Sequence, residues 1–122
     1  MREMTSAPGY LGIETERTRS VLRICLRGEL DMLTAPLLAE VLERDRASDR
    51  RHIVVDMTEL QFMDRAGLAA LMEGTGQGTQ SRPVLSITGC PPNVRRVLEL
   101  TGHEDLINDL PLTGLSRKPG SA

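Results

Sequence analysis

Acidic side chains at two turns are the first candidates for chemistry in this sequence. Asp31 ends the run GELD, and Asp64 stands in the stretch FMDRAGLAAL directly before an apolar run. Two carboxylates that a fold brings together can perform general acid–base catalysis. Here the positions after Asp64 hold Arg65 and Ala66, so no nucleophile, nearby histidine or metal-ligand set accompanies the pair. We therefore expect a protein that is not an enzyme.

Metal, redox and phosphate chemistry have no better support. Cys25 and Cys90 lack C-x-x-C spacing, and His52 and His103 stand far apart without a ligand-like spacing. Cys90 is interpreted as a buried, unreactive thiol. The glycine-rich stretch GTGQGTQS lacks the lysine of a phosphate-binding loop, and it follows a helix pattern instead of a strand. No metal and no cofactor are expected.

The composition excludes two further classes of partner. The chain has 122 residues, which suits one domain with a single core, and its 15 basic and 17 acidic residues give a net charge of −2. The charged stretch 44–51 interleaves both signs and is interpreted as a solvated helix end. Tyr10 and Phe62 are the only aromatic residues, too few for a base-stacking surface. Without an 18-residue apolar span or a secretory segment, we expect a cytoplasmic protein that binds neither nucleic acid nor membrane.

Alternating strand and helix patterns must position the two turns. Period-two alternation predicts two strands that pair antiparallel at one edge, and β-branched runs predict two central strands. Apolar stripes at helical spacing predict three helices, the first of them with Thr34 as its N-cap. The predicted elements are, in order, strands at 11–15 and 21–26, a helix from 34, a strand at 53–55, a helix from 65, a strand at 84–87 and a helix from 91.

This order predicts an α/β fold with a mainly parallel central β-sheet, one antiparallel edge strand and three to four flanking helices. Residues 1–10 lack periodicity and are predicted to form a flexible N-terminal arm, and residues 111–122 a disordered tail. In such sheets, sites form where strands end and helices begin, because unpaired helix N–H groups lie there. The segments in that position are 28–31, 62–67 and 89–91.

At these segments the sequence resembles a known family. The stretches LRGELD, IVVDMTELQFMDRAGLAAL and CPPNVRRVLELTGHEDLI resemble, in order and spacing, the STAS domain (sulfate transporter and anti-sigma factor antagonist) over residues 11–110. The third stretch is close to single-domain bacterial anti-sigma factor antagonists. The resemblance implies a STAS fold and a partner, an anti-sigma factor that has a histidine-kinase-like ATPase fold and phosphorylates serine. Antagonists occupy this partner and free a sigma factor for transcription.

The resemblance also implies where the partner binds. In the family, contact centres on an Asp-Ser-Ser-Gly or Asp-Ser-Thr-Gly turn and its helix, beside the Gly-Glu-Leu-Asp loop. Phosphorylation of the second hydroxyl residue in that turn ends binding. In this chain Asp64 and Gly67 match the first and last residues of that turn, and Asp31 matches the neighbouring acidic position. Arg65 and Ala66 replace the two hydroxyl residues. The implied partner-binding residues are Asp31, Asp64, Arg65, Ala66, Gly67 and Leu68.

Ala66 and Arg65 leave two questions open. Phosphorylation would add about −1.5 to −2 charges, which Ala66 cannot acquire, and the nearest hydroxyls, Thr58 and Thr75, are predicted to lie outside the turn. The protein is then either a constitutive antagonist or is controlled in another way. Arg65 either reaches an acidic group on the partner, or is solvated or paired with a nearby aspartate.

An alternative function is that of a non-enzymatic STAS subunit of a transport ATPase or of a sensory assembly. We expect the protein to be a monomer or a weak homodimer.

Overall fold

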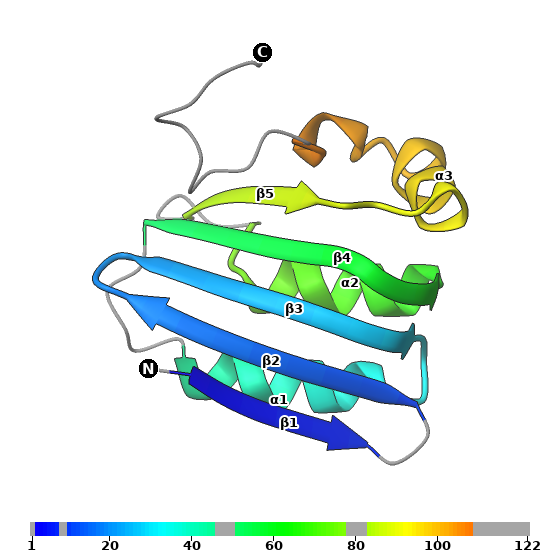
Figure 1. Ribbon diagram of the computed structural model, residues 1–122. Coiled ribbons are helices and arrows are strands. Elements are labelled where there is room, and N and C mark those ends of the chain that lie inside the picture. The colour runs from blue at the N-terminus through cyan, green and yellow to red at the C-terminus, as the bar shows by residue number, and fades with distance from the viewer. Residues whose placement is uncertain (1, 8–9, 46–50, 78–82, 109–122) are drawn as a thin grey trace.

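A five-stranded mixed β-sheet organises the chain (Figure 1). The computed structural model describes residues 2–7, 10–45, 51–77 and 83–108. The strands lie in sequence order across the sheet; the pairs β1–β2 and β2–β3 are antiparallel, and β3–β4 and β4–β5 are parallel. The elements are β1 (Arg2–Ala7), β2 (Leu11–Thr18), β3 (Val21–Leu30), α1 (Ala35–Asp45), β4 (His52–Met63), α2 (Arg65–Gly74), β5 (Val84–Thr88), α3 (Pro92–Leu100) and the 3₁₀ turn η1 (Glu104–Leu106).

The predicted α/β class and the order of elements from β2 to α3 are confirmed, and the sheet contains one more antiparallel strand than predicted. The structure places residues 2–7 in β1, where the sequence predicted a flexible arm. Strand β1 pairs with β2 in the register Met4↔Glu14. Backbone N–H and C=O groups make this ladder, so an edge strand can form without the alternation of apolar side chains that reveals buried strands. The predicted tail, 111–122, lies outside the described residues.

The main core lies between the sheet and the helices α1 and α2, which lie behind it in Figure 1. The alternate residues Leu22, Ile24 and Leu26 of β3 are buried on this face, as their spacing predicted. Helix α2 comes close to α1 at Gly74, where a Cβ atom would lie 2.4 Å from Cδ1 of Leu42. A larger residue at this position would require the Leu42 side chain or the helices to shift, so Gly74 permits their close approach.

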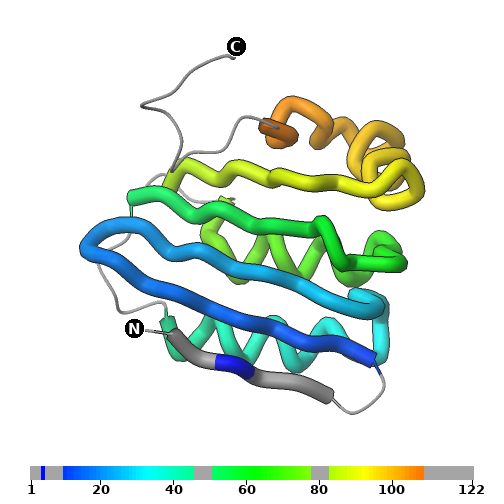
Figure 2. Tube along the Cα trace, viewed as in Figure 1, coloured from blue at the N-terminus to red at the C-terminus, as the bar shows by residue number. Residues whose placement is uncertain are grey.

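The connections that leave β3, β4 and β5 for the three helices all lie at one end of the sheet (Figure 2). This is the arrangement that parallel strands with right-handed crossovers produce, since each strand ends at the same edge and its helix returns along the face. The three segments predicted to carry a site therefore lie at this end.

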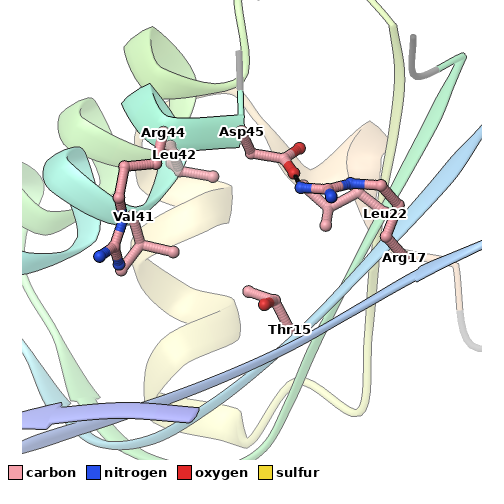
Figure 3. A pocket seen from close by; sticks show the side chains of 7 residues that line it. All are labelled: Thr15, Arg17, Leu22, Val41, Leu42, Arg44 and Asp45. Atoms are coloured by element: carbon pink, nitrogen blue, oxygen red, sulfur yellow. Dashed lines mark ion pairs between the residues drawn. The ribbon is translucent and has the colours of Figure 1, made fainter. Parts of the chain in front are cut away.

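At the opposite end of the sheet, the last residue of α1 is fixed by an ion pair. Asp45 is buried, and its carboxylate pairs with the guanidinium of Arg17 on β2 (Figure 3). The sequence predicted a solvated helix end at 44–51, but Asp45 is buried. Residues 46–50 lie outside the described residues. A buried carboxylate at a helix C-terminus is unfavourable with the helix dipole and with desolvation. The pair with Arg17 offsets this cost and anchors α1 to the sheet.

Candidate functional site

Asp64 lies between β4 and α2 and holds two turns at once. Its Oδ1 accepts a hydrogen bond from the N–H of Gly67 at 2.8 Å, which makes Asp64 the N-cap of α2. Its Oδ2 accepts the N–H of Met32, in the turn between β3 and α1, at 3.2 Å. The Asp64 N–H in turn donates to the carbonyl of Leu30 at 3.2 Å. Both carboxylate oxygens are engaged, so Asp64 fixes the geometry of this surface.

Asp31 holds the turn that leads into α1. Its Oδ1 accepts the N–H groups of Leu33 and Thr34, both at 3.0 Å, and its carbonyl accepts the N–H of Ala35 at 2.8 Å. The Thr34 hydroxyl, predicted to cap the helix, points back instead. It accepts the Asp31 N–H at 2.9 Å and donates to the Glu29 carbonyl at 2.8 Å. The side chains of Asp31 and Thr34 therefore brace the turn before α1, and the Thr34 hydroxyl does not cap the helix as predicted.

These two turns form one surface, because Met32 of the first turn is bonded to Asp64 of the second. The sequence suggested Asp31 and Asp64 as a carboxylate pair, and the structure joins them through a backbone N–H group instead. Each carboxylate accepts hydrogen bonds from backbone N–H groups and is oriented by them. The geometry suits a rigid recognition surface.

Gly67 and Leu68 support this surface from below. Gly67 is buried, and a Cβ atom there would lie 2.3 Å from the carbonyl oxygen of Leu30. Only glycine allows the first turn of α2 to come so close to the end of β3. Leu68 is buried in the core, and its N–H donates to the Asp64 carbonyl at 3.0 Å. These two predicted site residues shape the surface and do not face solvent.

Arg65 and Ala66, in the first turn of α2, are exposed. Among the described residues no acidic side chain forms an ion pair with Arg65, and that includes Asp31 and Asp64. A cation in the first turn faces the positive end of the helix dipole, at a cost of about 0.3–1 kcal/mol. This unpaired cation and the small side chain beside it are the groups that the two turns present outward.

Sequence reasoning missed three apolar residues on the same surface. Met32 and Leu33 are 70% and 80% exposed, and Phe62, two residues before Asp64, is 45% exposed. A signal was present: Met32 and Leu33 fall between a strand pattern and a helix pattern, so neither period assigns them to the core. Large apolar side chains in a short polar turn are candidates for contact with another protein.

The third predicted segment is tied to the middle and end of β4. Gly89 has φ +65°, and a Cβ atom there would lie 2.1 Å from Oγ1 of Thr58. Asn93 follows, and its side-chain amide donates to the Gln61 carbonyl at 2.7 Å. Cys90 is partly buried and packs against the core, in keeping with a structural thiol. We find no chemistry in this segment beyond support of β4.

Cys25 lies on the face of β3 opposite the helices, between two arginines. Burial, and next the nearby carboxylate of Asp56, raise the pKa of its thiol above the ordinary value. Arg23 and Arg27 act in the other direction but do not outweigh them. Asp56 accepts the Thr58 hydroxyl at 2.6 Å and lies 3.9 Å from Arg23. The thiol is therefore kept protonated, which does not suit a nucleophile.

A mixed sheet with its helix starts gathered at one end, and two turns there that are held by aspartates, define an α/β domain. The family described as "Mlab, STAS domain" matches residues 13–110. The chain belongs to the STAS-domain family. Within the described residues, none of the helices has the length and apolar character needed to cross a membrane.

Individual relatives agree with this assignment. The "Anti-sigma-B factor antagonist" of Staphylococcus aureus is 33% identical over 98 residues, which cover 80% of this chain and 91% of the relative. The crystal structure of an anti-sigma factor antagonist from Mycobacterium paratuberculosis has a TM-score of 0.71 at 24% identity, covering 92% of this chain and 97% of that one. The Bacillus cell fate determinant SpoIIAA in its phosphorylated form gives 0.64 at 20% identity, covering 85% and 96%. These two structures share the fold of this chain.

Proposed function

We propose that this protein is an anti-sigma factor antagonist, a non-catalytic cytoplasmic protein that binds an anti-sigma factor and releases its sigma factor. The names of its relatives support this role. The observation that carries it is the surface made by Asp31, Asp64, Arg65 and Ala66, in which both carboxylates fix turns and the first turn of α2 faces outward. Such a surface has the rigidity that protein recognition requires.

The proposed partner has the histidine-kinase-like ATPase fold that the family resemblance implies. Arg65 supports a partner with an acidic group at the contact, because the cation has no described ion-pair partner within the chain and stands where the helix dipole disfavours it. Placed against a carboxylate, its planar guanidinium can form two parallel hydrogen bonds. Arg65 would then contribute to both affinity and orientation.

Phosphorylation at the family site would not switch this surface. SpoIIAA was solved in a phosphorylated form, which supports phosphorylation as a control in the family. In this chain, Ala66 at that position offers no hydroxyl. The hydroxyls nearest to it in the sequence are engaged elsewhere: that of Thr58 donates to Asp56 at 2.6 Å, and that of the buried Thr75 to the Leu71 carbonyl at 2.7 Å. We therefore propose an antagonist that is constitutively competent to bind, or that is controlled by other means.

The experiment is a titration of the purified chain against each purified kinase-like anti-sigma factor of the source organism, followed by calorimetry. We expect one of them to bind and to release its sigma factor. The same mixture with labelled ATP should leave the chain unlabelled. Stoichiometric label on the surface would contradict constitutive action. Capture from lysate of a transport ATPase, with binding to no anti-sigma factor, would replace the proposal by the accessory-subunit function.

A further inference from the structure

Both aromatic side chains of the protein are exposed, and both lie at the end of the sheet that carries the site. Tyr10 is 57% exposed and Phe62 45% exposed. Glu29 of β3 lies between them: its N–H donates to the Tyr10 carbonyl at 2.7 Å, and it is the register partner of Phe62 on β4. The three residues therefore form a row across the sheet.

The two strand residues of this row face away from the helices. Glu29 and Phe62 are register partners, and the residue that follows each of them, Leu30 or Met63, is buried in the core. Successive side chains of a strand point to opposite faces. Glu29 and Phe62 therefore belong to the face of the sheet opposite α1 and α2, where an aromatic ring gains nothing from the core. Tyr10 directly precedes β2 and is bonded to Glu29 at the end of the sheet.

Met32 and Leu33 extend the apolar area around the end of the sheet, beyond Asp64. We name Tyr10, Met32, Leu33 and Phe62 the apolar collar. Among the described residues, seven large hydrophobic side chains are exposed, and the collar contains four of them. Single exposed apolar residues are normal on a protein surface, whereas a cluster of them at one end of the molecule indicates an interaction site. Aromatic residues and methionine are the types enriched in protein–protein interfaces.

We propose that the apolar collar is buried by the same anti-sigma factor that binds Arg65 and Ala66, an inference that rests on the proposed function. The Met32 N–H is bonded to Asp64 at 3.2 Å, and Phe62 is two residues from Asp64. A typical partner covers about 800 Å² and 20–30 residues on each side. A footprint of that size centred on the first turn of α2 extends beyond that turn toward Met32 and Phe62, the collar residues next to Asp64.

The chemistry of the partner surface follows from this arrangement. It carries an apolar depression that receives Leu33 and the ring of Phe62, and beside it an acidic group that meets Arg65. The apolar contact supplies most of the affinity, because water is expelled from exposed aliphatic and aromatic surface. The charged contact supplies orientation. The Asp31 and Asp64 carboxylates, already engaged with N–H groups, keep the collar in place.

The test compares alanine substitutions inside and outside the collar. Leu33→Ala and Phe62→Ala should each weaken binding to the purified anti-sigma factor at least tenfold in calorimetry. Leu100→Ala is the matched control, because Leu100 is 66% exposed on α3, and it should bind like wild type. Urea unfolding midpoints of all variants show whether the fold is retained, and Leu33→Ser provides a second variant at the residue least involved in the core.

The outcomes separate the two proposals. A wild-type chain that binds an anti-sigma factor, with unchanged affinity in both collar variants, overturns the collar inference and leaves the proposed function standing. A wild-type chain that binds no anti-sigma factor overturns both. Sedimentation velocity tests whether a second copy of the chain binds the collar. If the wild-type chain is a dimer, and Leu33→Ala abolishes the dimer but leaves the affinity for the anti-sigma factor unchanged, the collar serves self-association and the inference is overturned.

Discussion

Oδ2 of Asp64 accepts the N–H of Met32 at 3.2 Å across a sequence separation of 32 residues. This contact joins the turn after β3 to the turn after β4, and Oδ1 of the same carboxylate caps α2 through the Gly67 N–H. One side chain therefore sets the relative position of the groups that the surface presents. The consequences for stability and for binding can be measured separately.

Asp64→Ala should lower the free energy of unfolding by about 1–3 kcal/mol, since it removes an N-cap worth about 0.5–2 kcal/mol and a second hydrogen bond of about 1 kcal/mol. Asp64→Asn keeps one carbonyl acceptor and should lose less. Urea unfolding of the three proteins provides the measurement. Equal losses in both variants would show that the two oxygens do not act separately.

Gly67→Ala should destabilise the protein by about 1–3 kcal/mol, as overpacking typically does. At an exposed position of a helix, a change from glycine to alanine would stabilise the protein by about 1 kcal/mol. The sign of the change in the free energy of unfolding therefore shows whether the contact at Gly67 is close. The added Cβ would lie 2.3 Å from the Leu30 carbonyl oxygen, which is fixed in the backbone. Gly12→Ala is the control, because its Cβ would meet only the end of the flexible Arg27 side chain at 3.2 Å. Greater stability of Gly67→Ala would contradict the close contact.

Ala66→Asp should leave the unfolding midpoint nearly unchanged and weaken anti-sigma binding at least tenfold, or about 1.4 kcal/mol. An acid in the first turn of a helix is favourable with the dipole, whereas an unpaired charge buried in an interface is costly. Thr18→Asp adds the same charge at the far end of the sheet and should bind like wild type. Unchanged affinity of Ala66→Asp would place the interface elsewhere.

Arg65→Ala should change stability and binding in opposite directions. Removal of a cation from the first turn of α2 should stabilise the chain by a few tenths to about 1 kcal/mol. Loss of the proposed contact with a partner acid should weaken binding and reduce its dependence on salt. Titrations at low and high ionic strength test this. If affinity and salt dependence both match wild type, Arg65 is solvated in the complex as well.

Cys25 should react slowly with iodoacetamide in a Cys90→Ser background. Its raised pKa keeps the thiolate fraction low, so the midpoint of the rate's rise with pH should lie above that of an ordinary thiol, whose pKa is about 8.5. The raised folded pKa also means that this thiol stabilises the fold below its unfolded pKa, and that the contribution is lost as pH rises through the folded pKa.

Asp56→Asn should speed the alkylation of Cys25, since it removes the second cause of the raised pKa, after burial. Glu73→Gln, an exposed change on α2, is the control and should have no effect. An Asp56→Asn rate no faster than that of the parent would leave burial and the carboxylate of Glu14 as the causes of the raised pKa.

Local patterns in the sequence were sufficient for the fold class and for the strands and helices from β2 to α3, because apolar periodicity records which face each element buries. They did not predict β1, whose backbone pairs with β2 at an edge. They did not predict the burial of Asp45 either, since its partner Arg17 comes from a distant strand. A charged helix end looks the same in sequence whether it is solvated or paired.

The candidate site shows the same limit. Turn chemistry and family resemblance selected Asp31 and Asp64, but the hydrogen bond from Met32 to Asp64 depends on the parallel pairing of β3 and β4. That pairing contains register shifts between Cys25 and Arg27 and between Gly28 and Glu29. No short-range pattern determines such shifts, so sequence analysis could not predict the hydrogen bond that joins Met32 to Asp64.

The long separation between Met32 and Asp64 also bears on how the protein is made. Strands β3 and β4 can pair in parallel only after α1 has crossed between them, and pairings between distant residues form late and slowly in folding. While β4 is still being synthesised, Asp64 cannot reach the turn that contains Met32. Under the proposed function, a nascent chain in which β4 has not yet paired with β3 should therefore be unable to compete for an anti-sigma factor.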